Sequence, residues 1–164
     1  MYLMKVPFKS KIMSVDESWI DYNGHMNVTF YTSAFDAAVD EFLEHEIGIG
    51  PSSVKSTKKG SYALQTQYRY LQELLVNERF IIETFVVDYS HKQLHLMLNM
   101  KKLDSDTTTA SCETILLNVD LVERKSSKYE AGQLGKIKDL FDAAEGLRKL
   151  VIVGHKIGLR GTKR

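Results

Sequence analysis

The apolar positions between residues 28 and 43 repeat with the period of an α-helix. Apolar side chains recur there every three or four residues, so they share one helical face: Val28, Tyr31, Phe35, Ala38, Val39, Phe42 and Leu43. Asn27 precedes this stretch, and its side chain can accept a hydrogen bond from a free N–H of the first turn. Gly48 can end the helix, because glycine readily adopts the left-handed conformation common at helix C-termini. The pattern predicts one long helix that packs by its apolar face.

Segments with a period of two surround this helix. Residues 4–15 alternate loosely and predict a first strand, and stronger alternation follows in residues 62–72, 79–89, 92–102 and 109–123. Within residues 62–72 the alternation places Tyr62, Leu64, Tyr68 and Tyr70 on one face. Short joints favour antiparallel neighbours, so the four later strands are predicted to form a meander. Residues 51–60 predict an exposed loop. A strand, a long helix and four strands indicate an α+β fold with the helix packed on an antiparallel sheet.

The C-terminal quarter of the chain differs in charge from the rest. Residues 1–123 hold 11 Lys and Arg against 17 Asp and Glu, whereas residues 124–164 hold 11 against 4. We therefore divide the chain into a domain of residues 1–123 and a basic C-terminal extension, residues 124–164, packed on or beside it. The extension predicts a helix near residues 133–147, a short β-like run at 150–153 and a loose end at 158–164. Its charge suits an intramolecular fit, an anionic ligand near the tail, or a solvated surface.

Composition narrows the possible classes of function. The single cysteine, Cys112, excludes an internal disulfide and a cysteine-based metal cluster within one chain, and it fits a reducing compartment. His91 and His95 lack partners for a metal site, so no metal is expected. Lysines interrupt the N-terminal segment, and no apolar stretch approaches the roughly 20 residues of a membrane helix. We expect a cytoplasmic protein that uses no membrane, and no basic stripe interleaved with aromatic residues predicts nucleic-acid binding.

The segment from Asp21 to Asn27 gathers polar groups at the start of the long helix. The first N–H groups of a helix are unpaired, and the helix dipole adds partial positive charge there. A carbonyl oxygen placed against those groups would be polarised, and glycine at position 24 allows close approach to the backbone. Asp21 could attack such a carbonyl or deprotonate a water molecule, and His25 and Asn27 could add hydrogen bonds. The same residues also suit an ordinary turn and helix cap, so spacing alone leaves both interpretations open.

A resemblance to a known family favours the catalytic interpretation. The stretch Trp19-Ile-Asp-Tyr-Asn-Gly-His-Met-Asn27, followed by Tyr31 and Phe35 on the helix, resembles the signature of 4-hydroxybenzoyl-CoA thioesterase-like hotdog proteins. The family pattern has an aspartate three residues before a glycine, then often Gly-His-x-Asn, and a tyrosine four residues beyond the asparagine. The version in this chain is closest to betainyl-CoA thioesterases, including those fused to carnitine dehydrogenase. Weaker matches lie in residues 113–120 and 155–160.

The resemblance implies a fold, a reaction and a set of site residues. The expected fold is a hotdog, an antiparallel sheet of about five strands wrapped around one long helix. Asp21 would be the nucleophile or general base of an acyl-CoA thioesterase, backbone N–H groups near Gly24 to Asn27 would polarise the thioester carbonyl, and His25 and Asn27 would position substrate or water. The expected substrate-binding residues are Trp19, Tyr22, Gly24, Met26 and Tyr31, although Trp19 also suits a hydrophobic anchor for the loop.

The family also implies that CoA enters as part of the substrate, without a further cofactor, and that the chain forms a homodimer or homotetramer with CoA sites between subunits. Two other functions on the same fold stay open. One is a non-catalytic module that binds or senses acyl-CoA, and the other is a lyase of the enoyl-CoA hydratase kind.

Overall fold

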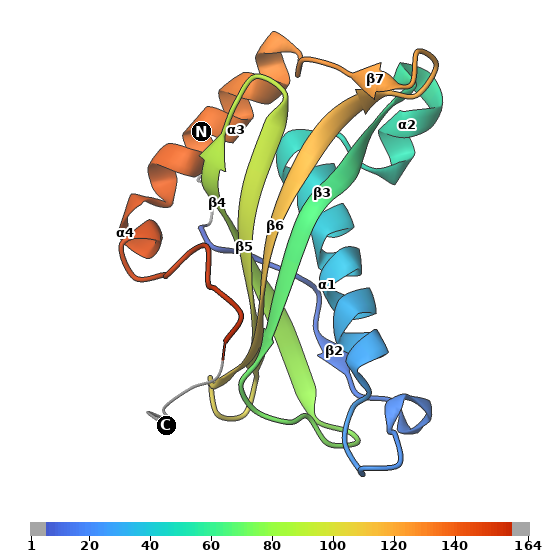
Figure 1. Cartoon of the computed structure of the whole chain (residues 1–164), viewed down its shortest axis with the longest axis vertical. Coiled ribbons are helices and arrows are strands. Elements are labelled where there is room, and N and C mark those ends of the chain that lie inside the picture. The colour runs from blue at the N-terminus through green and yellow to red at the C-terminus, as the bar shows by residue number, and fades with distance from the viewer. Residues whose placement is uncertain (1–5, 159–164) are drawn as a thin grey trace.

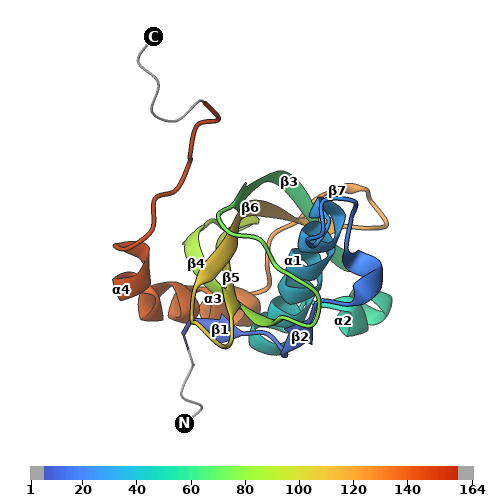
Figure 2. The ribbon, with the colours of Figure 1, turned by 90° about the horizontal axis from the view of Figure 1, so that it is seen from below.

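One long helix, α1 (Val28–Phe42), lies along the inner face of a curved antiparallel sheet in this computed structural model, which describes residues 6–158 (Figures 1 and 2). Asn27 caps the helix as predicted, because its side-chain oxygen accepts the Thr29 N–H at 2.9 Å. The chain then makes one wider, π-helical turn (Leu43–Ile47), and Gly48 ends it with a φ of 83°. The predicted apolar face is buried except at Val28, which is exposed, and Val39, which is half-buried. The residues of α1 that are buried in the core are Tyr31, Ala34, Phe35, Ala38 and Phe42.

The sheet carries the strands in the order β1-β4-β5-β6-β3, with β2 beside β4 and β7 beside β6. The long strands are β3 (Lys59–Tyr70), β4 (Arg79–Tyr89), β5 (Gln93–Lys102) and β6 (Thr108–Asp120). The short ones are β1 (Phe8–Lys9), β2 (Met13–Ser14) and β7 (Lys125–Ser126). All pairs are antiparallel. The α+β class and the sheet wrapped around one helix are thus confirmed.

The predicted first strand and the predicted meander are both wrong in part. Residues 4–15 were expected to form one strand, but the described part holds two short strands that pair with β4. Between them the Lys11 N–H donates to the Glu41 carboxylate instead of to the sheet. Strands β4, β5 and β6 do follow one another, whereas β3 pairs with β6 at the far edge. The short joint before β4 is therefore a crossover, residues 71–78, and not a hairpin.

The crossover is anchored at the N-terminus of α1. Leu74, at its centre, is fully buried. The Leu74 carbonyl accepts the Met26 N–H at 2.8 Å, and the Leu74 N–H donates to the Tyr31 hydroxyl oxygen at 3.1 Å. On its other side, the N–H groups of Leu71 and Gln72 both donate to the Thr109 carbonyl. The topology of the sheet thus brings residues 71–74 against the start of the helix.

A β-bulge changes which side chains of β3 share a face. The register of β3 against β6 shifts between Ala63 and Gln65, which leaves Leu64 as the extra residue. Because one extra residue reverses the alternation, Tyr62 lies on the opposite face from Tyr68. Tyr68 packs on the core beside α1, whereas Tyr62 is 40% exposed. The prediction that they share one face is therefore wrong.

Residues 51–60 are not a loop, because a helix, α2 (Pro51–Thr57), fills most of the segment. Proline suits the first helical turn, where no N–H is needed. The Glu44 carboxylate accepts the Ser52 N–H at 3.1 Å, which satisfies one of the free donors at the start of α2. Lys58, with a φ of 54°, ends the helix. The stabilising partner lies on the preceding turn of helix, so the local composition alone did not reveal this helix.

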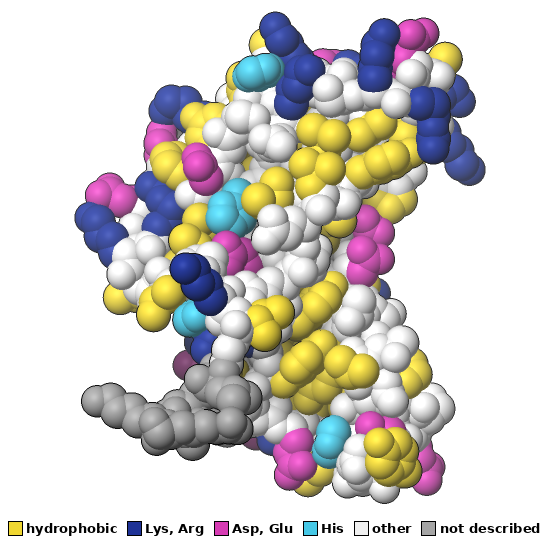
Figure 3. Space-filling model, in the orientation of Figure 1, with side chains coloured by type: hydrophobic (Ala, Val, Ile, Leu, Met, Phe, Trp, Pro, Cys, Tyr) yellow, Lys and Arg dark blue, Asp and Glu magenta, His cyan; other side chains and the backbone are white. Residues whose placement is uncertain are grey.

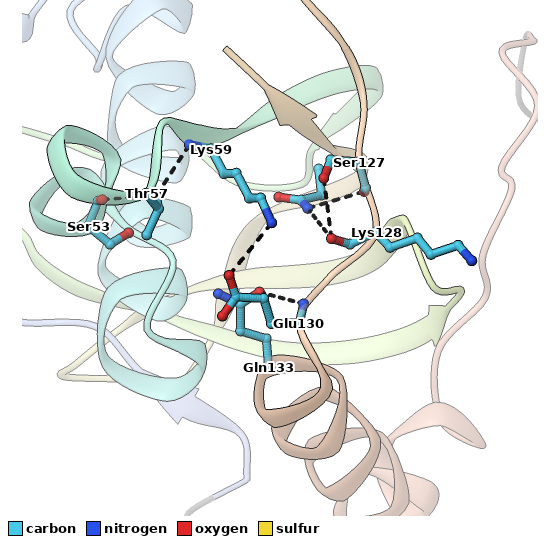
Figure 4. A network of polar contacts seen from close by, with 8 residues as sticks. Ser53, Thr57, Lys59, Ser127, Lys128, Glu130 and Gln133 are labelled. Atoms are coloured by element: carbon cyan, nitrogen blue, oxygen red, sulfur yellow. Dashed lines mark hydrogen bonds and ion pairs between the residues drawn. The ribbon is translucent and has the colours of Figure 1, made fainter. Parts of the chain in front are cut away.

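The C-terminal extension contains α3 (Ala131–Ala143) and the short α4 (Glu145–Arg148), where one helix over residues 133–147 was predicted. Figure 4 shows the start of α3, where Glu130 and Gln133 form a reciprocal capping box and Glu130 also pairs with Lys59 at 3.6 Å. Helix α3 lies along β4 and buries Ile137 and Leu140 in the main core (Figure 1).

Residues 150–158, here named the C-terminal strap, cross the outer face of the sheet without forming the predicted β-like run. The Glu113 carboxylate accepts the Gly154 N–H at 2.9 and 3.0 Å. The Gln67 amide donates to the His155 carbonyl at 2.7 Å, and the Arg69 guanidinium lies 2.6 Å from His155 Nε2. Residues 159–164, most of the predicted loose end, lie outside the described residues.

Candidate active site

The loop that leads into α1 is held by a short helical turn, Glu17–Trp19, capped by Asp16. The Asp16 carboxylate accepts the Ser18 N–H at 2.9 Å. The Trp19 ring stacks on Phe30 of α1 with a centroid distance of 5.1 Å and an interplanar angle of 10°. Trp19 thus anchors the loop on the helix.

The next residues form a tight turn in which one of the two carboxylate oxygens of Asp21 accepts a hydrogen bond. The Asp21 N–H donates to the His25 carbonyl and the Gly24 N–H to the Asp21 carbonyl, each at 3.0 Å. Asp21 Oδ1 accepts the Asn23 N–H at 2.7 Å. Gly24 has a φ of 81°, a conformation that residues with a Cβ rarely adopt. The turn therefore fixes the Asp21 side chain, and Asp21 Oδ2 has no hydrogen-bond partner within residues 6–158.

The backbone donors near the helix start are fewer than the sequence suggested. The N–H groups of Gly24, Met26 and Asn27 are taken by the carbonyls of Asp21, Leu74 and Trp19. The N–H groups of His25 and Val28 have no acceptor in the part of the chain that the structure describes. The sequence predicted that the amides from Gly24 to Asn27 would act as donors, but among the described residues only the His25 N–H is free for that role. The Val28 N–H, at the first position of the helix, is also free.

His25 and Asn27 each use one polar side-chain atom in a local hydrogen bond and have a second polar atom that is free. The Nδ1 atom of His25 lies 3.1 Å from the Met26 carbonyl, and because a carbonyl only accepts, Nδ1 carries the proton. In this tautomer Nε2 is the acceptor of the ring. Asn27 uses its oxygen to cap α1, which leaves its Nδ2 donor without a partner among the described residues.

A cavity of about 410 Å³ opens beside these groups. Its lining comes from the helix start, from the last residue of β3 and from the crossover: His25, Met26, Val28, Tyr31, Tyr70, Leu71, Gln72 and Glu73. The rings of Tyr31 and Tyr70 meet with centroids 5.3 Å apart and planes at 77°. Burial raises the pKa of Tyr31 to about 12, so its hydroxyl stays neutral over the physiological range.

The cavity takes up some of the predicted site residues and not others. His25, Met26 and Tyr31 line it. Asp21 and Gly24 lie in the turn beside it, and Trp19 packs away from it on Phe30. Tyr22 is 96% exposed. Four lining residues, from Tyr70 to Glu73, were missed, because no local pattern marks them and only the crossover brings them to the helix start.

Other chemistry-bearing groups are excluded or placed elsewhere. Burial raises the pKa of the Cys112 thiol to about 12, so this residue stays protonated and is a poor nucleophile. His95 Nε2 donates to the Glu113 carboxylate at 2.9 Å on the outer face of the sheet. Within residues 6–158, His, Cys, Asp and Glu nowhere gather in a group of three that could hold a metal ion. Across the same residues, none of the helices has both the length and the apolar character needed to cross a membrane.

An antiparallel sheet wrapped around one long helix defines the chain as a hotdog protein. Residues 15–140 match the model of the Thioesterase-like superfamily, and the chain belongs to that superfamily. It is therefore a thioester hydrolase, as the family resemblance of the segment from Trp19 to Asn27 led us to expect.

Curated relatives carry a more specific name. A betainyl-CoA thioesterase of Pseudomonas aeruginosa is 28% identical over 141 residues, which cover 86% of this chain and 88% of that protein. An L-carnitine dehydrogenase/betainyl-CoA thioesterase of Ruegeria pomeroyi is 34% identical over 120 residues, or 73% of this chain. The matched part spans 24% of that fused protein.

Solved structures share the fold. A Staphylococcus aureus protein determined in complex with CoA superposes with a TM-score of 0.82 at 24% identity, covering 97% of this chain and 99% of that one. A 1,4-dihydroxy-2-naphthoyl-CoA thioesterase of Synechocystis superposes with a TM-score of 0.71 at 14% identity, covering 81% and 96%. At these identities the likeness concerns the fold alone.

Proposed function

We propose that this chain hydrolyses an acyl-CoA thioester to a free carboxylic acid and CoA at the turn from Asp21 to Asn27. One observation carries the proposal. In Asp21, His25 and Asn27, one polar side-chain atom makes a hydrogen bond that holds the turn or caps α1. A second polar atom of each side chain is free, beside a cavity at the start of α1. The free groups are Asp21 Oδ2, His25 Nε2, Asn27 Nδ2 and the N–H groups of His25 and Val28.

The two free N–H groups supply the electrostatic part of the reaction. Both belong to residues that line the cavity, and Val28 is the first residue of α1, where the helix dipole adds positive potential. A thioester oxygen bound there would be polarised, and the negative charge that develops on it during attack would be stabilised. The acyl chain then extends into the cavity and the CoA moiety leaves through its mouth.

Asp21 supplies the nucleophile or the base. As nucleophile, Oδ2 attacks the thioester carbon, CoA leaves as thiolate, and water then hydrolyses the mixed anhydride on Asp21. As base, Oδ2 takes a proton from a water molecule that attacks the same carbon directly. In either route His25 Nε2 and Asn27 Nδ2 orient the water. In the first route water opens the mixed anhydride at Asp21 Cγ, so the acid keeps the unlabelled Asp21 oxygen, and a single turnover in ¹⁸O-labelled water puts the label on Asp21. In the second route the label enters the acid, so the same experiment separates the two.

The acyl group and the assembly belong to the same proposal. The names of the relatives favour a betainyl group, and the CoA complex of the Staphylococcus aureus protein supports CoA as the carrier. Water and side chains suffice for the reaction as proposed, with CoA entering only as part of the substrate. We place a second copy of the chain along β3, a sheet edge where Tyr62 and Leu64 are exposed apolar side chains. Apolar side chains also gather on the face of the molecule that Figure 3 shows.

The test is a thiol-release assay with a panel of acyl-CoA esters and the variant Asp21→Asn. Asparagine keeps an oxygen for the Asn23 N–H, so the turn should survive while the carboxylate is lost. We expect turnover to fall by about a hundredfold or more, the range found when a catalytic acid or base is removed. Asp16→Asn is the matched control, because Asp16 makes the same kind of cap five residues earlier. Equal activity in Asp21→Asn and wild type, or equal loss in both variants, would refute the role of Asp21.

A further inference from the structure

The cavity at the start of α1 has one fixed charge. Among its lining residues, Glu73 is the only acid and no lysine or arginine is present. The end of the molecule around the β2–α1 loop shows acidic side chains and a histidine, whereas Lys and Arg side chains gather at the opposite end, over α2 and β7 (Figure 3). Glu73 and Glu78 also add to burial in raising the pKa of Tyr31, so their negative potential reaches the cavity wall. A positively charged group is favoured there and an anionic one is disfavoured.

The position of Glu73 is set by its backbone. Residue 74 is anchored by hydrogen bonds at both its N–H and its carbonyl, and residues 71 and 72 are held by the Thr109 carbonyl. Glu73 therefore projects from a short stretch fixed on both sides. Its carboxylate has no ion-pair partner in the described part of the chain, so it is free to meet a ligand.

The cavity walls suit a bulky cation that cannot donate hydrogen bonds. Tyr31 and Tyr70 both line the cavity, and their rings meet edge to face at 77°. Aromatic rings attract quaternary ammonium groups through the negative charge of their faces. Tyr70 is 48% exposed, which leaves its ring accessible from the cavity mouth.

We propose that Glu73, Tyr31 and Tyr70 form the subsite that selects acyl groups carrying a quaternary ammonium next to the thioester. The inference rests on the proposed thioesterase function and adds the residues that set its specificity. In a betainyl ester the ammonium nitrogen lies two bonds, about 2.5 Å, from the carbonyl carbon. A carbonyl held by the N–H groups of His25 and Val28 therefore keeps the ammonium in this same cavity.

The charge is tested by comparing two esters of the same shape. Betainyl-CoA and 3,3-dimethylbutanoyl-CoA differ by the replacement of the cationic nitrogen with carbon. We expect wild type to prefer the cation in kcat/KM, and we expect Glu73→Gln and Tyr70→Leu each to lower the ratio of the two values by about two- to fivefold. Glu123→Gln is the control, because Glu123 is exposed and pairs with Lys125 far from the cavity.

A binding measurement separates the two proposals. Calorimetry with the Asp21→Asn background measures the affinity ratio of the two esters without turnover. If wild type hydrolyses esters but Glu73→Gln and Tyr70→Leu leave both ratios unchanged, the subsite is wrong and the thioesterase stands. If no ester is hydrolysed but the affinity ratio favours the cation and falls in both variants, the subsite stands and the hydrolytic function is wrong. Equal affinity of wild type for the two esters overturns the subsite in either case.

Discussion

The hydrogen bond between the Tyr31 hydroxyl and the Leu74 N–H joins the helix to the crossover, and Tyr31→Phe removes it with a single atom. Leu74 is fully buried and Tyr31 is 4% exposed, so water does not readily replace the lost partner. A buried N–H left without an acceptor costs about 1–3 kcal/mol. For a chain of this size that loss lowers the midpoint of thermal unfolding by roughly 2–12 °C.

Urea unfolding at a fixed protomer concentration measures this loss, since any self-association would otherwise shift the midpoint. Tyr70→Phe is the matched control, because Tyr70 packs on Tyr31 but is 48% exposed. Its loss should stay within about 0.5 kcal/mol. Hydrogen exchange at the Leu74 amide adds a local readout, and exchange should accelerate in Tyr31→Phe alone. If the two variants are equally stable and the Leu74 amide exchanges alike, the crossover is not anchored in this way.

Three further results are expected. Asn27→Ala should cost about 1 kcal/mol of stability by loss of the helix cap, and Asn27→Ser should restore that stability without restoring thiol release, because serine caps but lacks the amide donor. Glu113→Ala removes the acceptor of the Gly154 N–H. Limited proteolysis should then cleave the C-terminal strap at protease concentrations that leave wild type intact. The folded-state pKa of Tyr31 is raised from 10.0 to about 12. Its contribution to the free energy of unfolding is therefore fully present below pH 10 and is lost as pH rises toward 12. Wild type should lose stability in that pH window, and Tyr31→Phe should lack this loss.

Local patterns predicted the elements well where one physical signal dominates. The long helix from Val28 shows a period near 3.6 and an asparagine cap, and both features follow from adjacent residues. Strands β4 and β5 were found within a residue of their ends, because one face is buried against α1 and the other, apart from Phe85 and Met97, is only partly buried or exposed. Helix α2 was missed, since its first free N–H is satisfied by Glu44 rather than by its own sequence.

Strand order was beyond the same reasoning. A short joint is compatible with a hairpin or with a crossover, and the choice depends on where the apolar side chain of Leu74 is buried. The bulge at Leu64 is similar, because a single inserted residue leaves the alternation in the sequence unchanged and reverses the faces in the sheet. Both errors concern β3, whose apolar alternation continues across a strand that is exposed along much of its length.

The candidate site divides along the same line. The turn from Asp21 to Asn27 is contiguous, so its chemistry could be proposed from spacing and family resemblance. The opposite wall, Tyr70 to Glu73, reaches the helix start only because β3 lies at the far edge and the chain must cross the end of α1 to reach β4. The crossover fixes the backbone of Glu73 by anchoring the residues on either side. The side chain at position 73 takes no part in that anchoring, so it can be changed without disturbing the crossover. Catalytic groups on the turn and selective groups on the crossover can therefore change independently, which is why a substitution at Glu73 should alter the choice of acyl group and one at Asp21 should alter turnover of all of them.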